Sequence, residues 1–156
     1  MNDVDRLLSL EQIRALIATY AISFDDKDWD RFGTLWTEDA AFAVVGQQAF
    51  EGRDAMLEFL TTCLPDDYGG KHMNSPPLIE LAPDGESATA YTDVVWIPQN
   101  FENAIVARYR DSLVRRDGRW LFARREETPL QFKPGPPPMS DTAVGVSGAT
   151  MRTEGV

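Results

Sequence analysis

The chain has 156 residues, of which 43% are hydrophobic and 26% charged, and its formal net charge is −10. This length and balance are typical of one soluble globular domain with a single core. The acidic charge argues against nucleic acid and anionic membranes as partners, because phosphate groups bind basic surfaces. A single cysteine excludes an internal disulfide, and the acidic N-terminal segment has no apolar leader pattern, so we expect a cytoplasmic protein.

The first half of the chain predicts helices. Residues 9–12 have a capping-box pattern, and apolar residues then recur at helical spacing, so we expect a first helix over residues 9–25. A shorter apolar pattern predicts a second helix over residues 28–35, with Trp36 on its apolar side. A third helix is expected to begin at Gly52.

Strands are predicted elsewhere. A short pair is expected at residues 40–45 and 49–51, and four long strands follow at residues 71–82, 87–98, 103–116 and 119–128. The composition of residues 116–119 predicts a tight hairpin turn between the last two strands. Helices followed by an antiparallel meander predict an α+β fold. We expect a cone-shaped α+β barrel, in which a strongly curved, mixed and mainly antiparallel sheet packs on the helices and leaves a pocket for a small molecule.

The C-terminal segment has a different composition. It is rich in Pro, followed by Ser, Thr, Gly and Ala, and has no large apolar cluster. We therefore expect a domain over residues 1–132 and a Pro-rich tail over residues 133–156.

The last strands also predict self-assembly. A one-sided antiparallel sheet alternates apolar and polar residues, but these strands carry apolar residues on both faces, namely Ile105, Val106, Leu113 and Val114. We therefore expect a homodimer or homotrimer.

His72 is the only histidine in the chain and stands at the start of a predicted strand. Asp25 lies at the end of the first predicted helix, within a cluster of aspartates. Imidazole titrates near neutral pH, so His72 and Asp25 together at the mouth of the cone would form an acid–base dyad. The alternative interpretation is a structural histidine beside solvated carboxylates, and Asp26 is the alternative partner. Tyr20 is either a core tyrosine or a hydrogen-bond donor to a substrate.

Other sites receive less support from the sequence. One His and one Cys do not supply a zinc site, the carboxylates lack the spacing of a calcium loop, and no Gly-rich phosphate loop is present, so we expect neither metal nor cofactor. Cys63 is predicted to be a small buried side chain on the third helix. Trp120 and Phe122 are expected beneath the sheet. Mostly exposed strand charges are expected at Arg108, Arg110, Arg124 and Arg125, and the alternative is that one of these arginines reaches a substrate carbonyl.

The order of elements resembles the SnoaL-like group of the nuclear-transport-factor-2 (NTF2) fold. The resemblance covers about residues 8–130, and its landmarks are the segments 24–30, 35–40 and 52–53, His72, and the segments 109–111 and 115–120. Within the group, the chain is most similar to the scytalone dehydratase and γ-hexachlorocyclohexane dehydrochlorinase families. In both, an aspartate after the first helix pairs with a histidine on the first long strand. The resemblance places these roles on Asp25 and His72, and Tyr20 matches a tyrosine of bile-acid 7α-dehydratase.

The resemblance implies a cofactor-independent lyase that eliminates water or another leaving group from a small cyclic, largely apolar substrate. His72 would act as general base, Asp25 would orient it, and Tyr20 would donate a hydrogen bond. The residues expected around the substrate are Phe24, Trp36, Trp96 and Tyr109. An isomerase or polyketide-type cyclase with the same dyad, and a non-catalytic small-molecule-binding or assembly module, are the alternatives.

The substrate itself does not follow from the resemblance. Scytalone dehydratase has a second tyrosine where this chain has Val44, and its second histidine has no counterpart here. An asparagine of that family falls near Tyr109. The aspartate of ketosteroid isomerase is missing from residues 40–45.

Overall fold

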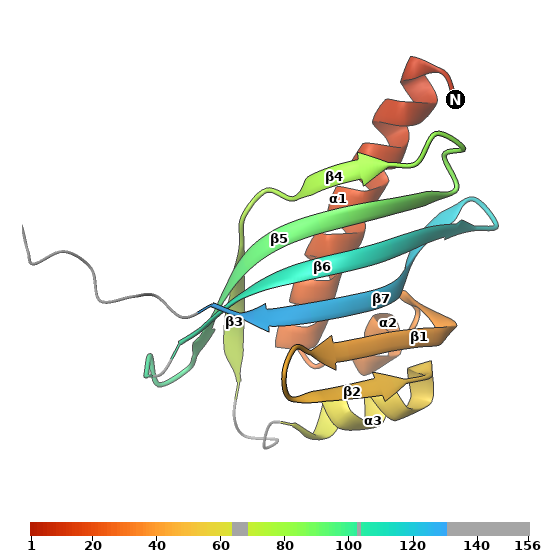
Figure 1. Ribbon diagram of the computed structural model, residues 1–156. Coiled ribbons are helices and arrows are strands. Elements are labelled where there is room, and N and C mark those ends of the chain that lie inside the picture. The colour runs from red at the N-terminus through yellow and green to blue at the C-terminus, as the bar shows by residue number, and fades with distance from the viewer. Residues whose placement is uncertain (64–68, 103, 131–156) are drawn as a thin grey trace, which may run out of the picture.

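The fold begins with helices and ends in a long meander of strands (Figure 1). The computed structural model describes residues 1–63, 69–102 and 104–130. The helices are α1 (Asp3–Asp25), α2 (Trp29–Gly33) and α3 (Arg53–Thr62), and the strands are β1 (Trp36–Val44), β2 (Gln48–Glu51), β3 (Gly70–Asn74), β4 (Leu78–Leu81), β5 (Ser87–Pro98), β6 (Ile105–Arg116) and β7 (Arg119–Pro129). The predicted tail over residues 133–156 lies outside the described residues, so the domain boundary stays a prediction.

Helix α1 begins at Asp3 and not at Ser9. The side chain of Asn2 accepts a hydrogen bond from the amide of Asp5 at 2.9 Å and caps the helix N-terminus. The predicted capping box is therefore wrong, since Ser9 is 1% exposed within the helix. The buried residues that follow lie three and four positions apart, the stripe by which an amphipathic helix packs on a core: Ile13, Leu16, Ile17 and Tyr20.

The length and apolar composition of α1 would also suit a membrane span, a property that core helices of globular domains share. In Figure 1, α1 crosses one face of the sheet behind β4 to β7. Its buried residues Ile13, Leu16, Ile17 and Tyr20 belong to the hydrophobic core, so the apolar face of this helix has a partner within the fold.

The sheet is mixed and mainly antiparallel, as the sequence predicts. Its strands run in the order β2-β1-β7-β6-β5-β3, and β4 also pairs with β5. All neighbours are antiparallel except β1 and β7, which are parallel. The turn between β6 and β7 has positive φ at both Asp117 (50°) and Gly118 (76°), which suits a tight two-residue hairpin.

The predicted strand over residues 71–82 is in fact two strands. Both β3 and β4 pair with β5, and Ser75, Pro76 and Pro77 separate them. Proline has no amide hydrogen, so this segment cannot continue the ladder. Ser75 bridges the gap: its amide donates to the carbonyl oxygen of Asp93 at 2.8 Å, and its hydroxyl accepts from the amide of Asp93 at 3.1 Å. The break leaves β3 as a short edge strand beside α1.

The core lies between the helices and the inner face of the sheet. The expected second helix is shorter than residues 28–35, since α2 ends at Gly33 and Trp36 begins β1. Trp120 and Phe122 are buried, as predicted. The largest fully buried apolar side chains among the described residues are Trp36, Phe32, Phe122, Ile13, Met56 and Leu113.

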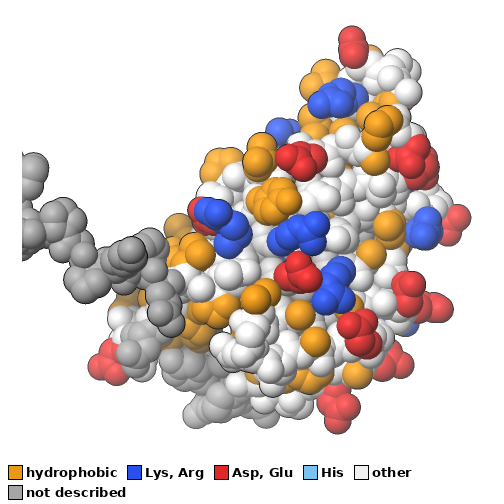
Figure 2. Space-filling view, viewed as in Figure 1, with side chains coloured by type: hydrophobic (Ala, Val, Ile, Leu, Met, Phe, Trp, Pro, Cys, Tyr) orange, Lys and Arg blue, Asp and Glu red, His pale blue; other side chains and the backbone are white. Residues whose placement is uncertain are grey.

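The outer face of the sheet, turned away from α1, carries charged side chains interspersed with apolar ones (Figure 2). Basic and acidic side chains lie next to each other over the middle strands. Arg108 binds both carboxylate oxygens of Asp93 at 2.6 and 3.0 Å, and Glu126 accepts from Arg110 at 3.3 Å and from Arg124 at 3.1 Å. Three of the four predicted exposed arginines therefore lie on this surface, and Arg125 does not.

Candidate active site

Asp25 and His72 form a closely bonded pair at one end of the sheet. Asp25 is the last residue of α1, and His72 lies in the middle of β3. Nδ1 of His72 lies 2.6 Å from Oδ1 of Asp25, and the amide of His72 donates to Oδ2 at 2.9 Å. Both side chains are only 4% exposed. Because an ionised carboxylate only accepts, Nδ1 carries the shared hydrogen, and in the neutral imidazole Nε2 then keeps its lone pair. The geometry therefore presents Nε2 as a base in a fixed orientation.

The neighbouring aspartates do not face the histidine. Nζ of Lys71 lies 2.8 Å from Oδ1 of Asp26, and both side chains are more than half exposed. Asp28 caps α2 by accepting from the amide of Arg31 at 3.2 Å. Asp26, the alternative partner, is thus a surface residue, and Asp25 is the carboxylate that points inward.

Tyr109 lies at the second nitrogen of the imidazole. Its hydroxyl oxygen is 3.4 Å from Nε2 of His72. Burial raises the pKa of Tyr109 well above its usual value, so the phenol keeps its proton at neutral pH and can donate. This residue was expected near the substrate, and its hydroxyl lies beside the imidazole nitrogen that faces away from Asp25.

Tyr20 packs against both His72 and Tyr109. Its ring centroid lies 6.0 Å from each of these two rings. Burial raises the pKa of Tyr20 to about 12, although the nearby charge of Arg125 opposes the shift. Two protonated phenols therefore flank the imidazole.

Arg125 was predicted to be exposed, and this is wrong. Its guanidinium donates to both oxygens of Asp111 at 2.7 and 2.8 Å, and both side chains are 0% exposed. The guanidinium carbon also lies 3.9 Å from the ring centroid of Tyr20 and 4.1 Å from that of Tyr109. Burial alone would lower the pKa of Arg125, but the charge of Asp111 and its hydrogen bonds raise that pKa above the usual range. A fixed, paired charge thus supports the two tyrosine rings.

A cavity of about 460 Å³ opens next to the dyad. Its polar lining includes His72, Tyr20, Tyr109 and Glu127, and its apolar walls include Phe24, Phe42, Phe59, Val94, Trp96 and Ile105. Cavities of this size and lining suit a small ring compound. Phe24, Trp96 and Tyr109, which we expected near the substrate, line this cavity. Trp36 does not: it is 2% exposed and packs in the core, 4.9 Å from Phe122 between ring centroids.

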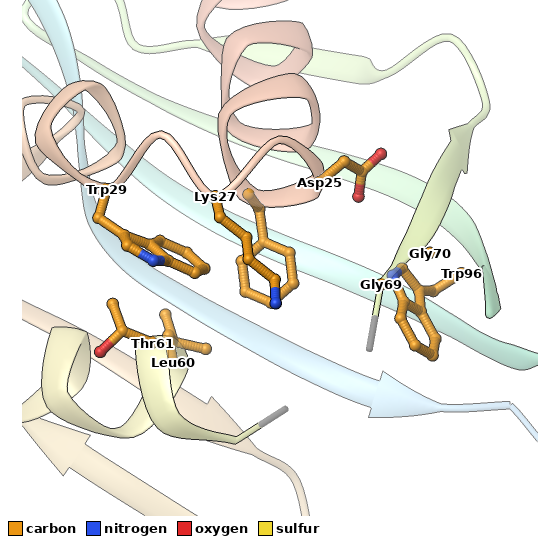
Figure 3. Close-up of a pocket in the computed structure, with 9 residues that line it drawn as sticks. Asp25, Lys27, Trp29, Leu60, Thr61, Gly69, Gly70 and Trp96 are labelled. Carbon is orange, nitrogen blue, oxygen red and sulfur yellow. The ribbon is translucent and has the colours of Figure 1, made fainter. Parts of the chain in front are cut away.

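Asp25 also borders a small hollow of about 10 Å³ (Figure 3). In this view its carboxylate points from the end of α1 toward the strand that begins at Gly70, with Trp96 beside Gly69 and Gly70. A Cβ atom at Gly70 would lie 2.5 Å from the indole of Trp96 and 2.6 Å from the carbonyl oxygen of Ile97. The absence of a side chain here therefore lets Trp96 pack over the start of β3, two residues before His72.

Cys63 is not buried as predicted. It is exposed at the end of α3 and lies at the rim of the cavity. Partial burial raises the pKa of its thiol, which favours the protonated form. In the part of the chain that the structure describes, no three His, Cys, Asp or Glu side chains are placed to hold a metal ion.

The sequence reasoning missed the inward charges of β7. Strict alternation from Trp120 and Phe122 would point residues 124 and 126 inward. The register against β6 shifts, however, because Leu113 pairs with Phe122 while the preceding residue of β6 pairs with Arg124. The extra residue is a β-bulge, which reverses the alternation for the rest of the strand. Arg125 and Glu127 therefore face inward, and nothing in the sequence pattern marks the bulge.

Asp111 did carry a signal. It alternates with Ala107, Tyr109 and Leu113 along β6, and these are buried residues of the same strand face. A buried carboxylate needs a buried positive charge beside it. Asp111 therefore predicts that one arginine points inward, but it does not identify that arginine.

Known proteins resemble this chain in sequence and in fold. The chain is similar to γ-hexachlorocyclohexane dehydrochlorinase of Sphingobium indicum, with 26% identity over 139 residues, which cover 86% of this chain and 88% of that protein. Among solved structures it is similar to an NTF2-like protein with a cystatin-like fold from Novosphingobium aromaticivorans, with a TM-score of 0.70, 30% identity, and coverage of 82% and 86% of the two chains. It also shares its fold with a hexachlorocyclohexane dehydrochlorinase of Novosphingobium barchaimii, with a TM-score of 0.68, 23% identity, and coverage of 86% and 100%.

The similarity to dehydrochlorinases supports an activity of the lyase or isomerase kind. The NTF2-like, cystatin-like fold that the sequence predicts is confirmed by these structures. The profile of the SnoaL-like domain matches residues 5–126, which is most of the chain, so the protein belongs to the SnoaL-like domain family.

Proposed function

We propose that this protein is a cofactor-independent lyase that eliminates water or another small leaving group from a small cyclic, largely apolar substrate. The observation that carries the proposal is the His72–Asp25 pair, with Nδ1 bonded to the carboxylate at 2.6 Å and His72 lining a cavity with mainly apolar walls. Two relatives are named dehydrochlorinases, a name that describes an elimination, and this adds support for the reaction class.

The proposed first step is removal of a carbon-bound proton by Nε2 of His72. The electron pair of the broken C–H bond forms a C=C bond, while the leaving group departs from the neighbouring carbon with the electrons of its own bond. Asp25 stabilises the imidazolium that forms and holds the ring in one tautomer. A positioned base of this kind contributes on the order of 10²–10⁴ to the rate.

The two phenols supply hydrogen bonds in this proposal. The hydroxyl of Tyr109 lies 3.4 Å from Nε2, close to where the proton would be removed. Burial keeps Tyr109 and Tyr20 protonated, so either can donate to a developing oxyanion or to the departing group.

An isomerase or cyclase would share the first step. Proton removal next to a carbonyl gives an enolate, and the two protonated phenols beside His72 would stabilise an enolate as well as a leaving group. Product mass separates these reactions, because elimination lowers the mass and isomerisation leaves it unchanged.

The test uses two probes. γ-Hexachlorocyclohexane reports elimination by chloride release, and 3-hydroxycyclohexanone reports it by the absorbance of the conjugated enone. We expect the wild-type protein to turn over at least one probe. His72→Gln and Asp25→Asn should each lower the turnover rate by a factor of about 10²–10⁴. Asp26→Asn is the matched control, because it removes the same charge one residue away at the surface, and it should stay within about twofold of the wild type. Near-wild-type turnover in both dyad variants would refute the proposal.

A further inference from the structure

A carboxylate that the proposed dyad does not use faces the cavity. Glu127 lines the cavity from β7 and pairs in register with Tyr109 of β6 on one side and Val44 of β1 on the other. Among the described residues, no side chain or backbone group makes a hydrogen bond or ion pair to its carboxylate. A half-buried acceptor of this kind is left for a ligand or water to satisfy.

The preceding residue shows the contrast. Glu126 points to the outer face and accepts from Arg110 and Arg124. That pairing, above all the hydrogen bond from Arg124, lowers the pKa of Glu126. Burial instead raises the pKa of Glu127, as expected for a carboxylate in an apolar wall.

The two basic side chains that act on the carboxylate of Glu127 each have a carboxylate partner of their own. Arg125 donates to Asp111 from Nε and Nη2, while its Nη1 is buried without a partner among the described residues. The Nδ1 hydrogen of His72 is shared with Asp25. Their charges only partly oppose the effect of burial on Glu127. A ligand in the cavity therefore meets an unneutralised negative group on this wall.

Glu127 and His72 stand on different walls. Strands β6 and β5 lie between β7 and β3, and adjacent strands are about 4.8 Å apart, so the two backbones are separated by roughly 14 Å along the sheet. Tyr109 lies between the two residues, with its hydroxyl at His72 and its backbone opposite Glu127. A ring compound between these walls would place one end at Nε2 of His72 and the other at Glu127.

We propose that Glu127 is a specificity-determining residue of the cavity, which accepts a hydrogen bond from a hydroxyl or ammonium group on a ring ligand and excludes ligands that carry a carboxylate at that end. This inference deepens the proposed function by naming a substrate class, but it depends on the cavity and not on turnover. A ligand donor satisfies the free acceptor, whereas a second carboxylate would be repelled in a region that water screens poorly.

The experiment compares three naphthalene probes by isothermal titration calorimetry at pH 7. 2-Naphthol offers a hydroxyl donor, 2-methoxynaphthalene has no donor, and 2-naphthoate carries a carboxylate. We expect the wild-type protein to bind 2-naphthol at least about tenfold more tightly than 2-naphthoate, since two nearby like charges repel at the dielectric of a partly buried site. It should also bind 2-naphthol more tightly than 2-methoxynaphthalene.

Glu127→Gln removes the charge and keeps the size, so it should reduce the preference for 2-naphthol over 2-naphthoate by about tenfold. Glu126→Gln is the matched control, because it removes the same charge from the outer face, and its preference should stay within about twofold of the wild type. A Glu127→Gln preference equal to the wild type would overturn the inference.

Two results on the wild-type protein alone would also overturn it, whatever the folding of the variant. The first is that 2-naphthol binds no more tightly than either 2-methoxynaphthalene or 2-naphthoate. The second is that none of the three probes binds. Calorimetry measures binding and involves no turnover. The binding preference can therefore be found in the absence of lyase activity, and lyase activity can be found in the absence of the binding preference.

Discussion

The substitution Asp111→Asn should strongly destabilise the protein, because it leaves the charge of Arg125 buried without a counter-charge. Asp111 and Arg125 are both 0% exposed and share two hydrogen bonds at 2.7 and 2.8 Å. Removing one partner of such a pair costs about 3–5 kcal/mol of unfolding free energy. That is a large share of the roughly 5–15 kcal/mol that stabilises a typical domain.

The sheet offers a matched control with the same geometry at the surface. Arg108 binds Asp93 through Nε and Nη2 at 2.6 and 3.0 Å, and both pairs join neighbouring residues of adjacent strands. The side chains of Arg108 and Asp93 are about half exposed, at 53% and 48%, so water screens their attraction. Asp93→Asn should therefore change the stability by no more than the error of the measurement.

Urea unfolding of the three proteins gives the comparison, read from the midpoint at constant slope. The double variant Asp111→Leu/Arg125→Met should recover much of the loss, because replacing a whole buried ion pair by apolar residues is often neutral. The reasoning is refuted if Asp111→Asn costs less than about 1 kcal/mol, or no more than Asp93→Asn, since a buried pair that is broken should cost several times that.

Three further results are expected. Because burial raises the pKa of Tyr20 from 10.0 to about 12, the folded state holds this proton more tightly than the unfolded state. Tyr20 alone should therefore make the unfolding free energy fall between about pH 10 and 12, by up to about 1.4 kcal/mol per pH unit. Tyr20→Phe should reduce the total slope in urea titrations by that contribution, and an unchanged slope would contradict the assignment. As His72 is the only histidine, ¹⁵N NMR of labelled histidine should show one imidazole with a protonated Nδ1 and a free Nε2, and Asp25→Asn should mix the tautomers; the opposite tautomer in the wild type would contradict the geometry. Gly70→Ala should cost about 1–3 kcal/mol by overpacking against Trp96, whereas Gly69→Ala, with its nearest neighbour atom at 3.7 Å, should be tolerated; equal stability of the two variants would contradict the packing argument.

The element order was predictable because hydrophobic periodicity is a local signal. The apolar stripe of α1 and the Asp117-Gly118 turn are each determined by residues close together in the sequence, and both appear in the structure. The start of α1 was predicted wrongly for two reasons. The true N-cap, Asn2, precedes the apolar pattern, and Ser9, a residue type common at N-caps, lies inside the helix.

The site was predictable only in part. Asp25 and His72 are 47 positions apart, and no local pattern joins them; the family resemblance supplied the pairing. Whether Trp36 faces the core or the cavity depends on where α2 ends, which periodicity does not fix to the residue. The inward charges of β7 depend on one β-bulge, whose position is set by pairing with β6. The homo-oligomer, the cytoplasmic location and the tail stay predictions.

In the proposed reaction, His72 removes a carbon-bound proton from a ring substrate. Exchange of the protons next to the carbonyl of 2-tetralone can be followed by ¹H NMR in D₂O, without any need for a leaving group. We predict that the wild-type protein accelerates this exchange over buffer, that His72→Gln lowers the protein-catalysed rate by about 10²–10⁴, and that Asp26→Asn retains it. Exchange by His72→Gln at the wild-type rate would contradict the claim.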